Sequence, residues 1–294
     1  MTDQHMNGAP PGAPDIRFYL PAEPLRPLVT SYYVLEAHHP LDDFTHPEWG
    51  NIRIALDGAW YFYEPGESEA VWPPAASIFG PTDRTRRFGT ERGTLIGIGL
   101  TPIGWLSLVG SDASLAANEV LPLDGELGRR GLDLRAALMA APDEAAQVAL
   151  LDDMLVARMR PRSAYCELAE RIQAALLGGE IDQVAELADA LRIEQRTLHR
   201  VCTSVFGFSP VRLLRRQRFL RTLGRVRDHL DQPLGRLIDS QYYDQAHFNR
   251  DFKAYMGMTP MAYFSLPREA LRRAVEERSR VLGAPVQGLH VPKS

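Results

Sequence analysis

The sequence predicts an α+β protein in which a β-rich, barrel-like N-terminal domain with helices is followed by an all-α C-terminal domain. Three observations support this prediction. Short runs of alternating apolar residues, separated by Gly and Pro, dominate residues 15–102 and are typical of a barrel or a sandwich. Residues 164–266 have the apolar spacing of helices. Within this helical segment the same pattern occurs twice, fifty residues apart, which indicates a single structural unit built twice.

The N-terminal half contains the expected strands. Residues 51–56 alternate apolar with other side chains, and the turn pair Asp57-Gly58 follows them. Three further runs end in a similar way, close to Gly or Pro: residues 60–63, 76–79 and 96–100. We expect these segments to pair in a barrel-like sheet.

Helical patterns follow the strands, at residues 132–140 and 143–160. After the long helical segment, Pro267 is expected to begin a charged helix with acidic and basic residues four positions apart. The residues from Gly283 onward resemble a loose tail.

A domain boundary is expected between Arg160 and Ser163, because Pro161 can end one helix and Ser163 can cap the next. We therefore divide the chain into a disordered N-terminus at 1–14, a folded domain at 15–160, a helical domain at 163–268, and a C-terminal helix and tail at 269–294.

The composition excludes several classes of protein. Hydrophobic residues make up 45% of the chain, as in globular proteins. The sequence has no signal-like N-terminus and no apolar run of about 18 residues, so we expect neither secretion nor a membrane span. Cys166 and Cys202 are its only cysteines, which argues against a disulfide framework and a zinc finger. We expect a cytoplasmic protein.

Charge is distributed unevenly along the chain. Residues 1–160 hold 12 Lys and Arg against 22 Asp and Glu, a net charge of −10. Residues 195–255 hold 12 against 5, a net charge of +7, although the whole chain carries −4. A basic segment in an acidic protein indicates that this segment binds nucleic acid. Chance segregation of solvated charge is the alternative.

The repeated pattern lies within the basic segment. In each copy a short amphipathic helix ends at Gly, and Ser-Pro or Thr-Pro begins the next helix. The matching positions are Leu198 and Phe248, Arg200 and Arg250, Cys202 and Phe252, Gly207 and Gly257, and Pro210 and Pro260.

The first copy belongs to a pair of short helices at residues 184–191 and 195–206, each with one apolar face. Only three residues connect them, and two helices joined by so short a turn form a helix-turn-helix. Arg196, His199 and Arg200 are expected to point outward from the second helix. Arg is the side chain best matched to guanine in the major groove of DNA.

The second copy has the same arrangement, with helices expected near residues 234–238 and over 245–255. Gln245, Asn249 and Arg250 are expected to point outward, and Gln and Asn suit the edge of adenine. A long helix at 211–230 joins the two units, and its arginines are candidates for phosphate contacts. These arginines are Arg212, Arg215, Arg216, Arg218, Arg221, Arg225 and Arg227.

At these residues the chain resembles the AraC/XylS family of bacterial transcription regulators. The matching motifs are Arg196-Thr197-Leu198-x-Arg200, Gly207-x-Ser209-Pro210, the run from Tyr242 to Lys253, and Gly257-x-Thr259-Pro260. The resemblance covers about residues 163–265 and implies two helix-turn-helix units whose recognition helices enter successive major-groove segments of double-stranded DNA. It implies that one segment is read by Arg196, His199 and Arg200, and the other by Gln245, Ala246, Asn249 and Arg250.

The chain departs from the family pattern at four positions. Arg192 and Gln241 stand where the family usually has Gly, and a residue with a Cβ resists a positive φ. Glu194 stands where Ser normally caps the recognition helix, and Cys202 replaces the usual Phe. We expect these changes to alter DNA affinity without abolishing it.

Residues 24–33, 78–83 and 97–102 look like parts of the sensor domains that precede such DNA-binding modules. We therefore interpret residues 15–160 as a sensor or dimerisation domain. A β-barrel there could enclose a small-molecule effector, and the candidate lining residues are Trp49, Trp60, Phe62 and Trp72. For any one of these side chains a place in the core is the alternative.

Polar groups in the same domain indicate no further site. The spacing of His38, His39, His46 and Glu48 is too irregular to predict a metal site. Arg84, Arg86 and Arg87 could hold an anionic effector, but a solvated loop is favoured.

Enzyme motifs are missing from the sequence. Gly97-x-Gly99 lacks the third Gly of a dinucleotide-binding motif, and there is neither a P-loop nor a G-x-S-x-G elbow. We expect no catalytic residue, no metal and no cofactor.

The sequence therefore predicts a sequence-specific DNA-binding transcription regulator, not an enzyme, that responds to a small-molecule effector through its N-terminal domain. One alternative is a regulator whose N-terminal domain only dimerises or binds a protein partner. Another is a barrel enzyme with a helical appendage. The expected partners are double-stranded DNA, RNA polymerase, a small-molecule effector and a second copy of the chain in a homodimer, with no membrane.

Overall fold

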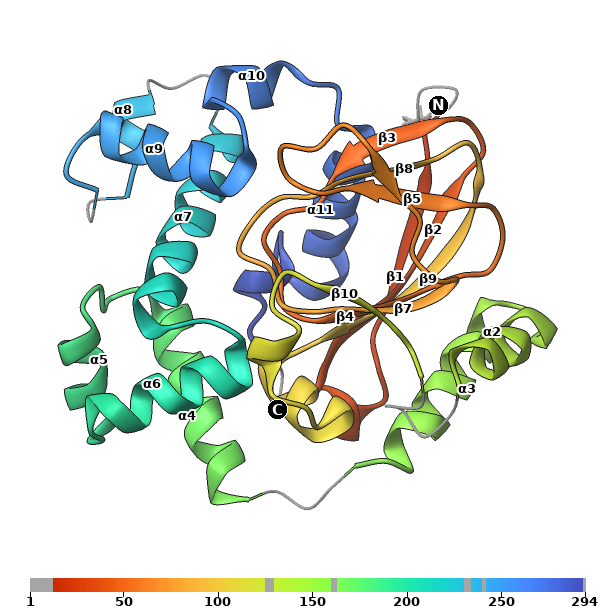
Figure 1. Ribbon diagram of the computed structural model, residues 1–294, viewed down its shortest axis with the longest axis horizontal. Helices are drawn as coiled ribbons and strands as arrows, with labels where there is room; N and C mark the ends of the chain where they lie inside the picture. The colour runs from red at the N-terminus through yellow and green to blue at the C-terminus, as the bar shows by residue number, and fades with distance from the viewer. Residues whose placement is uncertain (1–12, 125–129, 160–162, 230–233, 240–241, 293–294) are drawn as a thin grey trace, which may run out of the picture.

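The computed structural model describes residues 13–124, 130–159, 163–229, 234–239 and 242–292 of the 294-residue chain. A β-rich N-terminal region and a helical C-terminal region lie side by side, and the last long helix, α11, lies against the sheets (Figure 1). Most of the expected disordered N-terminus, and residues 160–162 of the expected boundary, fall outside the described residues.

The strands of the described residues form two antiparallel sheets, so the barrel-like N-terminal region is not a closed barrel. The six-stranded sheet has the order β1 (Asp15–Tyr19), β2 (Val29–Ala37), β9 (Gly93–Leu100), β4 (Asn51–Ala55), β7 (Ala76–Phe79) and β10 (Val120–Pro122). The four-stranded sheet has the order β3 (Leu41–Phe44), β8 (Arg87–Thr90), β5 (Trp60–Tyr63) and β6 (Ala70–Val71).

Strand β9 forms the centre of the larger sheet, because it pairs with both β2 and β4. Ile98 lies opposite Ile52, and both side chains are fully buried. The preceding residue, Gly97, lies opposite Tyr33, and a Cβ at this glycine would clash with the Tyr33 ring. The glycine therefore leaves the space in which the ring of Tyr33 lies across the sheet.

Helices α2 (Gly131–Ala140) and α3 (Glu144–Val156) occur close to where their periodicity predicted them. Asp143 caps α3 by accepting a hydrogen bond from the amide of Ala146 at 2.8 Å. Short helical turns connect the strands at η1 (Glu23–Leu25), α1 (Pro102–Gly104), η2 (Trp105–Val109) and η3 (Ala113–Leu115).

The helical region contains α4 (Ala164–Gly178), α5 (Val184–Leu191), α6 (Gln195–Phe206), α7 (Pro210–Asp228), α8 (Leu234–Leu237), α9 (Gln245–Met256) and α10 (Pro260–Ser265). Ser163 caps α4, as expected, through the amide of Cys166 at 3.3 Å. Helix α7 runs from the α5–α6 unit to the α8–α9 unit (Figure 1). None of the described helices is long and apolar enough to cross a membrane.

The two halves of the helical region have different hydrophobic cores. Buried residues of α4, α5, α6 and the start of α7 belong to the same cluster as the larger sheet. Within this cluster Phe206 meets Trp49 edge to face, with 5.7 Å between the ring centroids. The second half has its own aromatic cluster around Phe219, Phe248 and Phe252. The first helix-turn-helix unit is therefore continuous with the N-terminal region.

The chain returns to the N-terminal region after α10, through α11 (Glu269–Leu282) and η4 (Gln287–Leu289). The buried amide of Gln287 donates to the carbonyl oxygens of Gly50 and Leu100 at 3.2 and 3.0 Å, and accepts from Asn51 at 3.0 Å. The expectation of a loose tail is thus wrong, because this side chain satisfies polar groups at the end of the larger sheet.

Substitutions at two glycines can test how the helical region packs. Gly207 and Gly257 end α6 and α9 with φ of +81° and +70°, so an alanine at either costs about 1 kcal/mol. A Cβ at Gly207 would also lie 2.6 Å from Pro81 Cγ, whereas nothing lies within 4 Å of one at Gly257. We predict that Gly207→Ala lowers the free energy of unfolding by about 1 kcal/mol more than Gly257→Ala. Urea denaturation followed by circular dichroism measures this difference, and equal losses would contradict the packing of α6 against the N-terminal region.

Candidate functional site

The first helix-turn-helix unit consists of α5 and α6. Helix α5 ends at Arg192, whose φ of +56° is in the left-handed region. The backbone amides of Arg192 and Ile193 complete the turn through the carbonyl oxygens of Asp189 and Ala188, both at 3.0 Å. Arg192 therefore adopts the conformation that favours glycine, as its place in the family pattern predicted. The corresponding Gln241 lies outside the described residues.

One face of α6 is buried and the other is exposed. Leu198, Val201 and Cys202 are fully buried, and burial raises the pKa of the Cys202 thiol to about 12. Arg196, His199 and Arg200 are exposed on the opposite face, as predicted. These three residues line a surface groove together with Asp112, which belongs to the N-terminal region.

Helix α9 has the same design. Asp244 caps it by accepting a hydrogen bond from the amide of His247 at 2.6 Å. Phe248 and Phe252 are fully buried and pack on each other and on Phe219 of α7. The four residues that the family resemblance assigned to DNA lie away from this core: Gln245, Asn249 and Arg250 are exposed, and so is Ala246.

The arginines of α7 are mostly paired within the chain, and one of them is buried. Most are held by acidic residues of the chain, in the pairs Arg212–Asp83, Arg215–Asp251, Arg218–Asp182, Arg221–Asp239 and Arg225–Asp239. Arg216 is completely buried. The expectation of phosphate contacts is therefore wrong for Arg216, and the other pairs show that these charges connect α7 to its neighbours.

Arg216 extends from α7 into the N-terminal region. Its guanidinium lies 3.6 Å from the centre of a Trp49 ring, and its Nη1 donates to the carbonyl oxygen of Thr82 at 3.2 Å. Burial lowers the pKa of Arg216 to about 9. Trp49 therefore belongs to the interface between the two regions, and its assignment to an effector pocket is wrong.

A cavity of about 410 Å³ lies between the two sheets and α11. Three of the four predicted aromatic residues line it: Trp60 and Phe62 are buried, and Trp72 is 58% exposed. Most of the other apolar lining residues could not be predicted from the sequence; they include Phe18, Tyr33, Phe79, Phe88, Leu95 and Val275. They come from separate strands and from α11, so no local pattern connects them.

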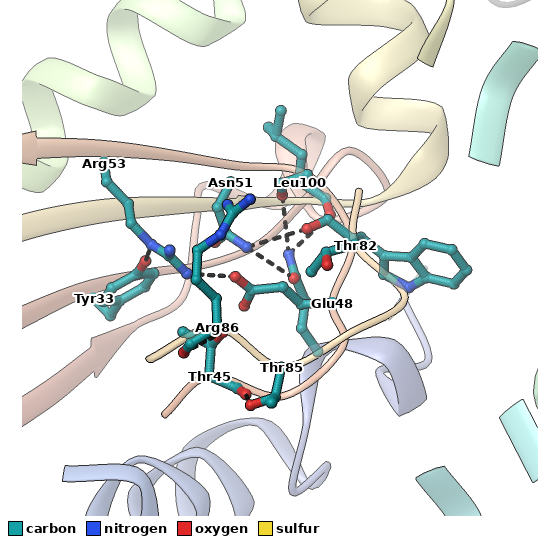
Figure 2. Close-up of polar contacts among 12 residues, drawn as sticks. Tyr33, Thr45, Glu48, Asn51, Arg53, Thr82, Thr85, Arg86 and Leu100 are labelled. Carbon is teal, nitrogen blue, oxygen red and sulfur yellow. Dashed lines mark hydrogen bonds and ion pairs between the residues drawn. The ribbon is translucent and has the colours of Figure 1, made fainter. Parts of the chain in front are cut away.

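Charged residues line the same cavity. Figure 2 shows the polar contacts of three of them, Glu48, Arg53 and Arg86. Arg53 forms an ion pair with Glu48 and donates to the hydroxyl of Tyr33 at 2.9 Å. Arg86 is buried and donates to the carbonyl oxygen of Asn118 at 2.8 Å, and burial lowers its pKa. The expected solvated loop is therefore wrong for Arg86, because this side chain turns inward over the ring of Phe62, 4.7 Å from its centre.

The histidines of the N-terminal region do not form a metal site together with Glu48 in the described residues. His46 lies 2.8 Å from the Tyr263 hydroxyl, and burial lowers the pKa of its imidazole to about 3, so it is neutral at pH 7. Within the described ranges, the group of His, Cys and acidic side chains close enough to share an ion is Asp15, Glu36 and His38, at a partly exposed sheet edge.

Comparison with protein families matches residues 187–265 to a family described as a helix-turn-helix domain. The match begins in α5 and ends with α10, so it includes both helix-turn-helix units. It confirms the resemblance that the paired motifs indicated. Among curated proteins, no sequence matches this chain.

Among solved structures, ToxT from Vibrio cholerae aligns with 80% of this chain and 98% of its own, at 9% identity and a TM-score of 0.44. A structure of ToxT bound to (E)-4-(8-methylnaphthalen-1-yl)but-3-enoic acid aligns with 85% and 98%, at 10% identity and a TM-score of 0.42. The AraC-like transcriptional activator CuxR aligns with 71% and 86%, at 16% identity and a TM-score of 0.26.

The buried position of Arg216 leads to a prediction about stability. Arg216→Ala leaves a cavity beside Trp49 and removes the donor to Thr82, so we expect the free energy of unfolding to fall by about 2–4 kcal/mol. Arg225→Ala on the same helix is the control, since this side chain is 52% exposed and Asp239 retains its ion pair with Arg221 in the variant. Its expected loss is about 0–1 kcal/mol. Urea denaturation followed by tryptophan fluorescence compares the two, and similar losses would exclude Arg216 as the connection between the regions.

Proposed function

We propose that this protein is a sequence-specific DNA-binding transcription regulator and that its N-terminal region binds a small-molecule effector. The observation that carries the proposal is the helix-turn-helix match over both units, at residues 187–265. The basic segment supports it, since residues 195–255 have a net charge of +7 in a chain of net charge −4. In this proposal residues 15–160 form the effector domain, residues 163–268 the DNA-binding domain, and the protein works in the cytoplasm.

The exposed residues of α6 and α9 are the proposed readers of base sequence. Arg196, His199 and Arg200 read one major-groove segment, where an arginine donates two hydrogen bonds to guanine. Gln245, Ala246, Asn249 and Arg250 read the next segment. The exposed faces of α6 and α9 support these roles, because the opposite faces of both helices are buried in the hydrophobic cores.

The cavity favours an effector-binding N-terminal region over one that only dimerises or binds a protein. Its volume of about 410 Å³ lies within the usual range for ligand sites. An effector acts by binding one arrangement of the two regions more tightly than another. Homodimer formation and contact with RNA polymerase remain predicted partnerships.

The two reading faces make separate predictions for DNA binding. Arg200→Ala and Arg250→Ala are each expected to cost about 1–3 kcal/mol on the specific site, because each removes a base contact. The control is Arg92→Ala, an exposed arginine in a turn of the N-terminal region. The measurement is a mobility shift with DNA from upstream of the protein's own gene, at two salt concentrations and with a scrambled competitor.

Wild-type protein is expected to select the upstream DNA and to lose affinity steeply as salt rises. Arg92→Ala should bind like the wild type. If both reading-face variants also bound like the wild type, the assignment of α6 and α9 would be wrong. Weak binding without sequence preference by the wild type would contradict the proposed function itself.

A further inference from the structure

Helix α11 follows the helix-turn-helix match and forms one wall of the cavity. Residues 187–265 end before it begins at Glu269, so its residues are not part of the DNA-binding family pattern. Ala270, Leu271, Ala274, Val275 and Arg278 of α11 line the cavity. The amide of Leu271 donates to the buried carboxylate of Asp43 at 3.0 Å, which fixes the first turn of α11 to β3. Helix α11 is therefore a fixed part of the cavity wall.

Arg278 is a buried cation that forms no ion pair within the described residues. It is 7% exposed, and Glu48, which forms its ion pair with Arg53, acts on Arg278 only through its charge, which raises the Arg278 pKa. Its Nη atoms meet only the hydroxyls of Ser31 and Thr30, at the long distances of 3.4 and 3.3 Å. Its Nε has no hydrogen-bond partner. Burial lowers the pKa of Arg278 to about 10, so it remains charged at pH 7. Buried guanidinium groups are normally paired, and this one lines an open space.

The other charges of the cavity do not supply the missing anion. Glu48, the acidic side chain among the lining residues, forms an ion pair with Arg53. Arg86 has its own partner in Glu64, at 3.2 Å, and His46 is neutral. Among the described residues, the cavity thus has one guanidinium without an ion-pair partner, a charge that a ligand with a single negative charge would match.

Most of the remaining lining is apolar, and it includes several aromatic rings. Phe18 lies beneath the guanidinium of Arg278, with 5.3 Å from its Cζ to the ring centre. Trp60, Phe62, Phe79 and Phe88 line the rest of the space. A ligand that fits this lining has an apolar body, which the aromatic rings remove from water, and one polar end.

We propose that the cavity binds an apolar monocarboxylate whose carboxylate is held by Arg278 of α11. This inference rests on the proposed function, because it names the chemical class of the effector. A carboxylate matches both the single positive charge of Arg278 and the fork of its guanidinium, which donates two parallel hydrogen bonds.

The position of Arg278 also connects the ligand to the DNA-binding region. Helix α11 follows α10 after only three residues, and Tyr263 of α10 lies beneath the guanidinium of Arg268 in this connection, with 4.1 Å from the Arg268 Cζ to the ring centre. A carboxylate on Arg278 holds α11 against the sheets and thereby favours one position of the second helix-turn-helix unit.

The test compares ligands that differ only in charge. Biphenyl-4-acetate and the neutral biphenyl-4-acetamide are titrated into the full-length protein, and binding is followed by calorimetry and by the fluorescence of the cavity tryptophans Trp60 and Trp72. The wild type is expected to bind the acid on the order of tenfold or more tightly than the amide. Decanoate and decanamide repeat the comparison with an aliphatic body.

Variants separate the role of Arg278 from a general effect on folding. Arg278→Gln should bind acid and amide with similar affinity, and Arg278→Lys should keep some of the preference. Arg272→Gln is the matched control, because this exposed arginine on the same helix pairs with Glu276 at 3.3 Å. It should keep the full preference. The melting temperature of each variant shows that the fold is intact.

Equal affinity of acid and amide in the wild type, or a preference that persists in a folded Arg278→Gln variant, would overturn the proposal. So would the failure of every probe to bind. The mobility-shift assay decides the proposed function independently. Selective DNA binding without a preference for the acid would contradict only this inference. Binding of the acid without selective DNA binding would contradict the proposed function as a regulator.

Discussion

The burial of one cation, Arg216, sets how the two regions of this protein are joined. Removing a guanidinium from water is costly, and the protein offsets the cost with the face of Trp49 and the carbonyl oxygen of Thr82. Because these partners belong to the N-terminal region, the compensation exists only when α7 lies against it. Helix α7 carries one helix-turn-helix unit at each end, so the same contact positions both recognition helices relative to the sheets.

The end of the chain makes a second connection of the same kind. Gln217 of α7 donates to the carbonyl oxygen of Gly288 at 2.8 Å, and the neighbouring Gln287 is hydrogen-bonded into the end of the larger sheet. The polypeptide therefore leaves the second helix-turn-helix unit, forms a wall of the cavity, and closes back on α7. A change at the cavity wall is transmitted through continuous chain as well as through the packed interface.

Many local features could be predicted from the sequence, because they depend on neighbours within one or two turns. Ser163 caps its helix as expected, and Gly207 and Gly257 end α6 and α9 in the left-handed conformation. The burial of individual arginine side chains was harder to predict. Arg216 and Arg225 lie on the same helix, yet the first is fully buried and the second half exposed. No local spacing distinguishes them.

Periodicity and turn chemistry, which act over short distances along the chain, were enough to establish the α+β class, the repeated helix-turn-helix unit and the exposed faces of α6 and α9. They could not show that Trp49 belongs to the interface, that Arg86 and Arg278 line the cavity, or that the tail is packed. Such outcomes depend on contacts between distant residues, as from Gln287 to Asn51 across 236 positions, and the energy of these contacts exists only after the chain has folded.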